Sequence, residues 1–255
     1  MEKAAKKRQS NIILALDLAL ANSHVLLSQS LKILNLVHPS LCAVKLNRQA
    51  VLPLGLFNGV RKIIVKAHDL GLPAIMDAKI NDIGNTNRAI AEYYYKAGFD
   101  AVIASPFIGW DDGLQPVFDV AQKMNRGVIL LVYMSHKGAF EGYGQMVQDQ
   151  VTKQLVPQYR IFAEKALKWN ADGAVVGATY PDKIREVYSV LKEKVPIYSP
   201  GVGAQGGDVE ASVKAGSSYL IVGRAIVDSK KPERTAESIR DAAWRSLENR
   251  TKKNE

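Results

Sequence analysis

Short apolar runs recur along the chain at intervals that suit helical connections between parallel strands. The runs are rich in Val, Ile, Leu and Ala, and they lack the polar alternation of a strand that faces water on one side. We therefore expect strands that are buried on both faces. The eight runs are Ile12–Leu18, Ala43–Leu46, Ala74–Ile80, Ala101–Ser105, Val128–Met134, Ala174–Ala178, Ile197–Ser199 and Tyr219–Val222.

Amphipathic stretches separate most of these runs. In Asn87–Ala97 the apolar residues recur at helical spacing, and Pro181–Lys194 begins with a proline, which suits the first turn of a helix. Alternating strands and helices predict an α/β fold, a single (β/α)₈ TIM barrel that takes up residues 1–255. A doubly wound open sheet is the alternative, but it would usually carry a glycine-rich turn after its first strand, where this chain has Leu16-Asp17-Leu18.

One interval breaks this rhythm. Residues 138–156 contain three glycines and several glutamines, and a further helix is expected at Tyr159–Trp169. The interval predicts either an elongated loop over the barrel mouth or a short extra helix.

Composition fits an ordinary globular enzyme, with 47% hydrophobic and 23% charged residues. The single cysteine, Cys42, excludes an internal disulfide and suits a reducing compartment, so we expect a cytoplasmic protein. No apolar segment is long enough to span a bilayer, and Asp17 interrupts the segment that most resembles a signal peptide.

A net charge of +9 raises the question of nucleic-acid binding. Much of the excess lies in short basic tails at about residues 1–10 and 248–255, which we expect to be solvated. The rest of the chain has no basic stripe interleaved with aromatic residues, and no nucleic-acid partner is predicted.

The third run holds the most informative group of charges. Asp77 and Lys79 are two residues apart, so in a strand they share a face, and Asp82 follows in the next loop. Asp17 and Lys45 stand at the ends of the first two runs. A structural ion pair would explain Asp77 and Lys79 alone, but several charges converging on the carboxyl end of a barrel favour an active site.

Glycines gather near the C-terminus in Ser199-Pro200-Gly201-Val202-Gly203-Ala204-Gln205-Gly206-Gly207-Asp208, and Gly223-Arg224 follows the eighth run. Barrels often bind phosphate with the loops after strands seven and eight, where glycine main chain and a helix N-terminus approach the anion. Arg224 supplies a charged donor, and Gln205 can reach over a ligand. The glycines also suggest a mobile lid.

Ser135, in Met134-Ser135-His136, ends the fifth run and could bind a heterocycle. The four histidines show no metal-site spacing, so neither a metal nor another cofactor is predicted.

Together these segments resemble the orotidine 5′-monophosphate decarboxylase family, in particular its shorter, archaeal-type branch. The resemblance runs from about Asn11 to Ile226. The residues that carry it are Asp17, Lys45, Asp77-Ala78-Lys79-Ile80-Asn81-Asp82-Ile83 with Thr86, Met134-Ser135-His136, the glycine segment 199–208 and Gly223-Arg224.

The resemblance implies a role for each residue at the charged side of the site. Lys79 would protonate C6 of the pyrimidine and stabilise the carbanion that remains when carbon dioxide leaves. Asp77 would lie beside the departing carboxylate and act either by repulsion or by fixing Lys79. Lys45 would orient Asp77 and contact the ribose, and Asp17 would bind ribose hydroxyls.

The resemblance also implies a homodimer, in which catalytic Asp82 and substrate-binding Thr86 reach the neighbouring subunit's site. Ser135 would contact the pyrimidine. The phosphate side would be formed by Pro200, Gly201, Val202, Gly203, Gln205, Gly223 and Arg224. The loop Ser105–Gly109 lacks a histidine found in some relatives, and we assign it no role.

Three other functions fit parts of the pattern. A metal-dependent sugar-phosphate decarboxylase or hexulose-phosphate synthase shares Asp-x-Lys-x-x-Asp but needs further acidic ligands, which the Lys45-Leu46-Asn47 segment does not offer. A Schiff-base aldolase needs a neutral lysine, whereas two aspartates near Lys79 favour the charged form. A non-catalytic phosphometabolite-binding protein would use the glycine loop and have no need of the charge cluster.

Overall fold

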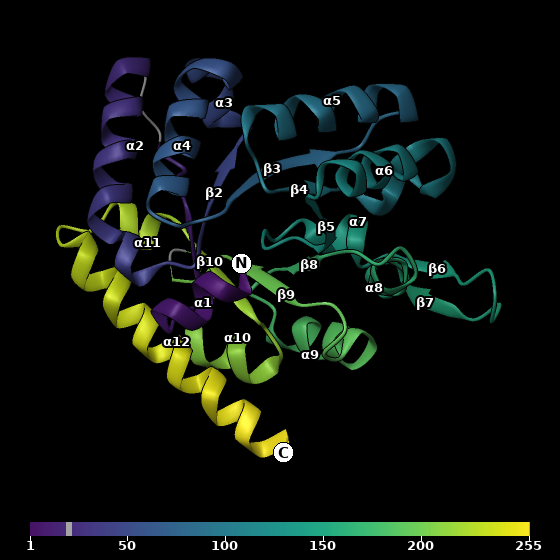
Figure 1. The fold of residues 1–255 in the computed structure, drawn as a ribbon. Helices are drawn as coiled ribbons and strands as arrows, with labels where there is room; N and C mark the ends of the chain where they lie inside the picture. Colours follow the sequence, from purple (N-terminus) through teal and green to yellow (C-terminus); the bar gives the residue numbers. More distant parts are fainter. Residues whose placement is uncertain (19–21, 204, 255) are drawn as a thin grey trace.

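Eight parallel strands close into a barrel at the centre of the computed structural model, which describes residues 1–18, 22–203 and 205–254 (Figure 1). Their order around the barrel is β1-β10-β9-β8-β5-β4-β3-β2, and β1 pairs with both β10 and β2. The strands are β1 (Ile12–Ala15), β2 (Ala43–Asn47), β3 (Ala74–Ile80), β4 (Ala101–Ala104), β5 (Gly127–Tyr133), β8 (Gly173–Val176), β9 (Ile197–Pro200) and β10 (Tyr219–Val222). The predicted TIM barrel is confirmed, and each predicted run overlaps one of its strands, with bounds that differ by one or a few residues for most of them.

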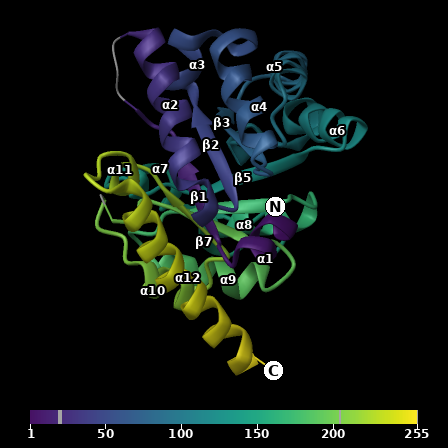
Figure 2. The ribbon, with the colours of Figure 1, turned by 60° about the vertical axis from the view of Figure 1, so that its left-hand side comes forward.

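Helices surround the barrel on its outer side (Figures 1 and 2). The predicted helices are confirmed as α5, α8 and α9. The helices are α1 (Glu2–Arg8), α2 (Ser23–Val37), α3 (Arg48–Leu54), α4 (Arg61–Asp69), α5 (Gly84–Ala97), α6 (Gln115–Met124), α7 (Ala139–Tyr143), α8 (Gln158–Lys168), α9 (Pro181–Leu191), α10 (Val209–Ala215), α11 (Arg224–Val227) and α12 (Pro232–Asn254). Within the described residues, none of the helices has the length and apolar character needed to cross a bilayer.

Strand alternation divides the core into an outer and an inner layer. On β1, Ile12 and Leu14 belong to the cluster that packs against the helices, whereas Ile13 belongs to a second cluster inside the barrel. Near the amino ends of β9 and β10, Tyr198 belongs to this inner layer and Tyr219 packs against it. Their ring centroids lie 5.0 Å apart. Side chains thus fill the barrel, and any ligand must bind at its carboxyl end.

The ends of the chain form α1 and the end of α12, and the basic side chains of Lys3, Lys6, Lys7 and Lys252 are exposed, as expected of solvated tails. Arg8 and Arg250 are the exceptions, because both are partly buried and bind main-chain carbonyls. At the N-terminus, Arg8 of α1 donates hydrogen bonds to the carbonyls of Leu70 and Gly71. At the C-terminus, Arg250 of α12 donates to Val213 O at 2.8 Å and to Ser217 O at 2.9 Å. Burial lowers the pKa of Arg250. Glu255 lies outside the described residues, and a single domain over residues 1–255 stays a prediction.

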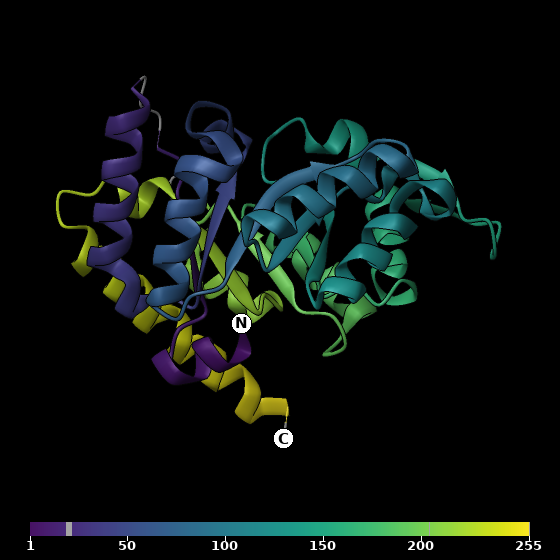
Figure 3. The ribbon, with the colours of Figure 1, turned by 45° about the horizontal axis from the view of Figure 1, so that its top comes forward.

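The irregular interval 138–156 forms the short helix α7 and most of a two-stranded antiparallel hairpin. The hairpin strands are β6 (Met146–Gln148) and β7 (Leu155–Pro157), and Figures 1 and 3 show the hairpin extending away from the barrel. Asp149 closes its turn by accepting hydrogen bonds from the main-chain N–H groups of Val151 and Thr152. The extra helix was among the expected alternatives, whereas the hairpin was not predicted.

Candidate active site

A cavity of about 460 Å³ lies at the carboxyl ends of the strands. Its volume is in the range of small-molecule binding sites. Most of the predicted site residues line it together: Asp17, Lys45, Asp77, Lys79, Ser135, Pro200, Gly201, Val202, Gln205, Gly223 and Arg224. The apolar side chains of Ile103, Leu131, Val175 and Ile221 also line it. Residues from distant parts of the sequence therefore meet as the barrel topology predicts.

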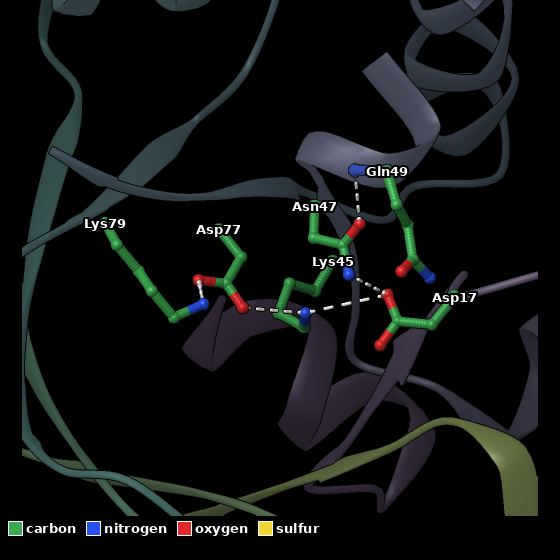
Figure 4. Close-up of polar contacts among 6 residues, drawn as sticks. All are labelled: Asp17, Lys45, Asn47, Gln49, Asp77 and Lys79. Atoms are coloured by element: carbon green, nitrogen blue, oxygen red, sulfur yellow. Dashed lines mark hydrogen bonds and ion pairs between the residues drawn. The ribbon is translucent and has the colours of Figure 1, made fainter. Parts of the chain in front are cut away.

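Four charged side chains form a row of alternating sign along one side of the cavity (Figure 4). Lys79 Nζ lies 2.6 Å from Asp77 Oδ1, and Lys45 Nζ lies 2.9 Å from Asp77 Oδ2. Lys45 Nζ also lies 3.8 Å from Asp17 Oδ1. Only 5% of the Lys45 side chain is exposed, so its charge depends on these two carboxylates for compensation.

Asp77 lies between the two ammonium groups and is largely buried. Burial alone would raise its pKa, but the charges and hydrogen bonds of Lys45 and Lys79 outweigh burial and hold the pKa of Asp77 below its usual range. The carboxylate therefore stays charged at neutral pH. It can keep both lysine side chains in place without accepting a proton from either.

The backbone of Lys79 departs from regular strand geometry. Its φ is +48°, in the left-handed region that residues with a Cβ seldom adopt, and the β3–β4 register shifts between Met76 and Ile80. Such a conformation costs about 1–3 kcal/mol and is concentrated at functional sites. The bulge places the Lys79 side chain against Asp77 and toward the cavity, so the sequence prediction that these two residues share a face is confirmed.

Asn47 and Gln49 also line the cavity and were not predicted (Figure 4). Asn47 Nδ2 donates to Asp17 Oδ1 at 2.8 Å, while its Oδ1 accepts from the N–H of Gln49 at 2.9 Å and caps α3. Asn47 therefore joins the charged row to the first turn of a helix. The alternation rule used for Asp77 and Lys79 would have found it, because Asn47 lies two residues after Lys45 on β2.

The glycine loop after β9 forms the opposite side of the cavity. Gly201 and Gly203 have φ values of +97° and +73°, and Gly207 donates its N–H to Gly201 O at 3.1 Å. The positive φ of Gly201 favours glycine at this position, and a Cβ there would lie 2.7 Å from Gln205 Oε1, at the end of a flexible side chain that would have to move. Gly203 belongs to the loop but not to the cavity-lining residues described, and Ala204 lies outside the described residues.

Arg224 begins α11 at the same side of the cavity, directly after Gly223. A Cβ on Gly223 would lie 3.3 Å from Ala15 Cβ and 3.8 Å from Asp17 Oδ2. The loop after β10 therefore passes close to the end of β1. Arg224, which is exposed, therefore lines the cavity near the Asp17 end of the charged row.

Asp82 and Thr86 are exposed and do not line the cavity in the described part of the chain. Asn87, which is fully buried, holds the loop that carries Asp82. Its Oδ1 accepts from Asp82 N–H at 3.0 Å, and its Nδ2 donates to Asp82 O and, at 2.9 Å, to Gly113 O. The main chain of Asp82 thus has a defined position outside the cavity.

Within the described residues, no three or more His, Cys, Asp or Glu side chains are placed to hold an ion together. In the charged row, Lys45 occupies the space between Asp17 and Asp77. The donor set present there suits an anionic, hydrogen-bonding ligand better than a divalent cation.

The sequence matches the family described as "Orotidine 5'-phosphate decarboxylase / HUMPS family" over residues 10–239. It is 34% identical over 230 residues to the orotidine 5′-phosphate decarboxylase of the archaeon Methanosarcina mazei, covering 90% of this chain and 93% of that protein. The crystal structure of orotidine 5′-phosphate decarboxylase from Pyrococcus horikoshii OT3 matches with a TM-score of 0.75 and 33% identity, over 91% of this chain and 98% of that chain. The enzyme from Methanocaldococcus jannaschii complexed with inhibitor BMP matches with a TM-score of 0.77 and 30% identity, over 92% and 98% respectively.

Proposed function

The chain belongs to the orotidine 5′-phosphate decarboxylase / HUMPS family, and we propose that it converts orotidine 5′-monophosphate to uridine 5′-monophosphate (UMP) and carbon dioxide. The observation that carries this proposal is the placement of Lys79, whose ammonium lies 2.6 Å from Asp77 at the wall of a cavity that also holds a glycine loop and Arg224. A nucleotide has a phosphate for the loop, a ribose for the aspartates and a base for the lysine.

The phosphate anchors the substrate far from the reacting carbon. Arg224 supplies a charge-assisted donor, and the positive φ values of Gly201 and Gly203 support a close approach of main chain to the anion. Pro200, Val202, Gln205 and Gly223 complete this subsite. Binding energy from the phosphate is available to hold the pyrimidine against the charged row.

Asp17 and Lys45 bind the ribose hydroxyls, and Asn47 keeps the Asp17 carboxylate oriented through its 2.8 Å hydrogen bond. Ser135, on the loop after β5, contacts the pyrimidine. The ring lies over the apolar residues Leu131 and Val175, which lower the local dielectric constant. Electrostatic interactions between the base and the charged row are stronger there than in water.

The reaction breaks the bond between C6 and the carboxyl carbon. The electron pair stays on C6 as carbon dioxide departs, and the Lys79 ammonium donates a proton to C6, which gives UMP and a neutral amine that regains a proton from solvent. Before that transfer the ammonium stabilises the negative charge that develops on C6. Asp77 holds Lys79 in place, and its depressed pKa keeps it charged while it does so. The step needs no external electron acceptor, because the electron pair released by the carboxyl carbon stays on C6 and the reaction involves no net oxidation.

Loss of ultraviolet absorbance after addition of orotidine monophosphate to chelator-treated protein tests this function. Full turnover after chelation is the expected result. Activity that disappears with chelation and returns with magnesium would instead favour a metal-dependent reaction of the same family. Trapping of a substrate adduct by borohydride would favour an aldolase, and stabilisation by UMP without turnover would favour a binding protein.

We further propose that the active unit is a homodimer in which Asp82 and Thr86 complete the neighbouring subunit's site. Their exposure outside their own cavity supports this arrangement, as does Ile83 beside them, which is 62% exposed although it is apolar. The hydrogen bonds of Asn87 would give Asp82 a fixed position before the subunits meet. The cytoplasmic location stays a prediction.

Mixing Lys79→Ala protein with Asp82→Asn protein tests the shared site. Each variant alone is expected to be almost inactive. In a mixed dimer one of the two sites has both residues intact, so activity should return as subunits exchange. No recovery after exchange has been verified by mass spectrometry of the mixed dimers would contradict the placement of Asp82.

A further inference from the structure

The loop after β8, residues 177–180, follows a strand that lies between β5 and β9 in the barrel, and none of its residues lines the cavity in the described structure. Gly177 N–H donates to Tyr133 O at 2.9 Å, and Ala178 N–H donates to Pro200 O at 2.8 Å. Tyr133 ends β5, before the loop that carries Ser135, and Pro200 ends β9, before the glycine loop. The main chain of this short loop is therefore hydrogen-bonded to the ends of the two strands that precede the Ser135 loop and the glycine loop.

Close packing on both sides leaves the loop little freedom to move independently. A Cβ on Gly177 would lie 2.6 Å from Ser135 Cα, so the two main chains touch directly. On the other side, a Cβ on Gly207 would lie 2.8 Å from Ala178 Cβ. A displacement of residues 177–180 must consequently move Ser135 or the glycine loop as well.

Two hydroxyl groups of this loop hold the main chain around Ser135. Thr179 Oγ1 donates to Ser135 O at 2.9 Å, and Tyr180 Oη donates to His136 O at 3.0 Å. These carbonyls lie beyond the end of β5, where the strand ladder no longer fixes the chain. The Tyr180 ring also packs edge-on against Tyr133, with centroids 5.2 Å apart, which sets the direction of its hydroxyl.

We propose that Tyr180 is a positioning residue for recognition of the base, with Thr179 as its neighbour in the same role. Through the His136 carbonyl, Tyr180 holds the Ser135 segment in the conformation that receives the pyrimidine. The segment is therefore already ordered before the substrate binds, and binding does not lose the conformational entropy of ordering it. The inference rests on the proposed function, because Ser135 contacts the base only if the ligand is a nucleotide. Tyr180 itself touches no substrate atom.

The variant Tyr180→Phe tests this role, because it removes the hydroxyl and keeps the ring against Tyr133. The dissociation constant of UMP should rise about fivefold, the change expected for loss of one net hydrogen bond. The dissociation constant of ribose 5-phosphate, which has no base, should stay unchanged. In turnover, KM for orotidine monophosphate should rise while kcat changes much less, because the interaction lost supports ground state and transition state alike.

Tyr95→Phe is a matched control, because Tyr95 Oη donates to Gly127 O at 3.1 Å at the opposite end of β5. It removes a tyrosine–carbonyl bond from the same strand and should change neither dissociation constant. Thr179→Val, which keeps the side-chain shape, should reproduce the selective loss of UMP affinity and provides a second variant.

A Tyr180→Phe protein that binds UMP as tightly as the wild type would overturn the inference. Equal weakening of UMP and ribose 5-phosphate would also overturn it, because that result indicates general loosening of the cavity. Failure of the proposed function gives a different result: wild-type protein would neither decarboxylate orotidine monophosphate nor bind UMP, and the role assigned to Tyr180 would fall with it.

Discussion

Charged side chains gather at both ends of the barrel, but their partners differ. At the amino end, Asp100 Oδ2 accepts from the N–H of Ala74, the first residue of β3, and lies 2.8 Å from His68 Nε2, while its Oδ1 accepts from Arg126. At the carboxyl end, Asp77 is bonded to two lysine side chains at the cavity wall.

The difference separates structural from functional charge in this fold. Asp172, which precedes β8, likewise accepts from Val128 N–H of the neighbouring strand β5 at 2.8 Å. These carboxylates at the amino end connect adjacent strands by hydrogen bonds. Their oxygens therefore accept hydrogen bonds from groups of the protein itself. The carboxyl-end ammonium groups have capacity left for a ligand, and Lys79 keeps a strained backbone that a purely structural ion pair does not need.

The largest effect is expected for Lys79→Ala. Loss of the proton donor and of the charge beside C6 should lower kcat/KM by at least about 10⁴-fold. The unfolding free energy should change by no more than about 1 kcal/mol, because the Lys79 side chain is partly exposed. The absorbance assay and urea titrations provide the two measurements. Lys96→Ala, which removes a surface lysine 2.9 Å from Glu92, should alter neither quantity. Activity within tenfold of wild type would refute the role of Lys79.

Asp77→Asn should lower kcat/KM by about 10³-fold, because the lysines lose the carboxylate that positions them. It should also destabilise the protein by about 3 kcal/mol at neutral pH, since Lys45 stays buried with weaker compensation.

The pH dependence of that destabilisation follows from the lowered pKa of Asp77. The folded pKa lies below the unfolded value, so the stabilisation is fully present above about pH 4 and is lost as pH falls through the folded pKa. Urea titrations of both proteins should therefore converge below pH 4. A difference that grows with acidification would contradict the assignment.

At the phosphate side, Arg224→Met should reduce kcat/KM about a hundredfold, mainly through KM, because a charge-assisted hydrogen bond to the phosphate is lost. Arg185→Met, which removes a surface arginine 2.7 Å from Asp182, is the comparison and should leave kinetics unchanged. If Arg224→Met reduced kcat alone, Arg224 would act on the reacting centre instead of the phosphate.

The smallest effect on activity is expected at the amino end. Asp100→Asn should lower the unfolding free energy by about 2 kcal/mol, because hydrogen bonds to a charged carboxylate are lost. The value of kcat/KM should stay within about twofold of wild type, measured on protein whose folding is confirmed by circular dichroism. A large loss of kcat/KM with an unchanged unfolding free energy would contradict the assignment of Asp100 to structure and of the carboxyl-end charges to function.

The sequence predicted the barrel and most of the cavity because both follow from short-range periodicity and chain order. Buried apolar runs identify strands, and the carboxyl ends of parallel strands meet at one end of a barrel whatever their separation in sequence. Asn47 follows the same rule and was overlooked. Its neighbour Gln49 lies in α3, where strand alternation gives no information.

Other features depend on tertiary contacts that periodicity does not encode. The left-handed conformation of Lys79 is not one that a lysine favours, and the surrounding barrel has to impose it. Arg8 and Arg250 look like solvated charges until the carbonyls they bind are known. The β6–β7 hairpin has strands of only three residues, too short to give a recognisable alternation.

If Lys79 donates a proton to C6 of the pyrimidine, it should also remove that proton from UMP, and this reverse step can be observed without decarboxylation. Proton NMR of UMP in D₂O with the wild-type protein should show the C6 hydrogen signal disappearing while the C5 signal persists. Lys79→Ala protein should leave both signals intact. Equal loss of the C6 signal with both proteins, or none with an active wild-type enzyme, would contradict the account.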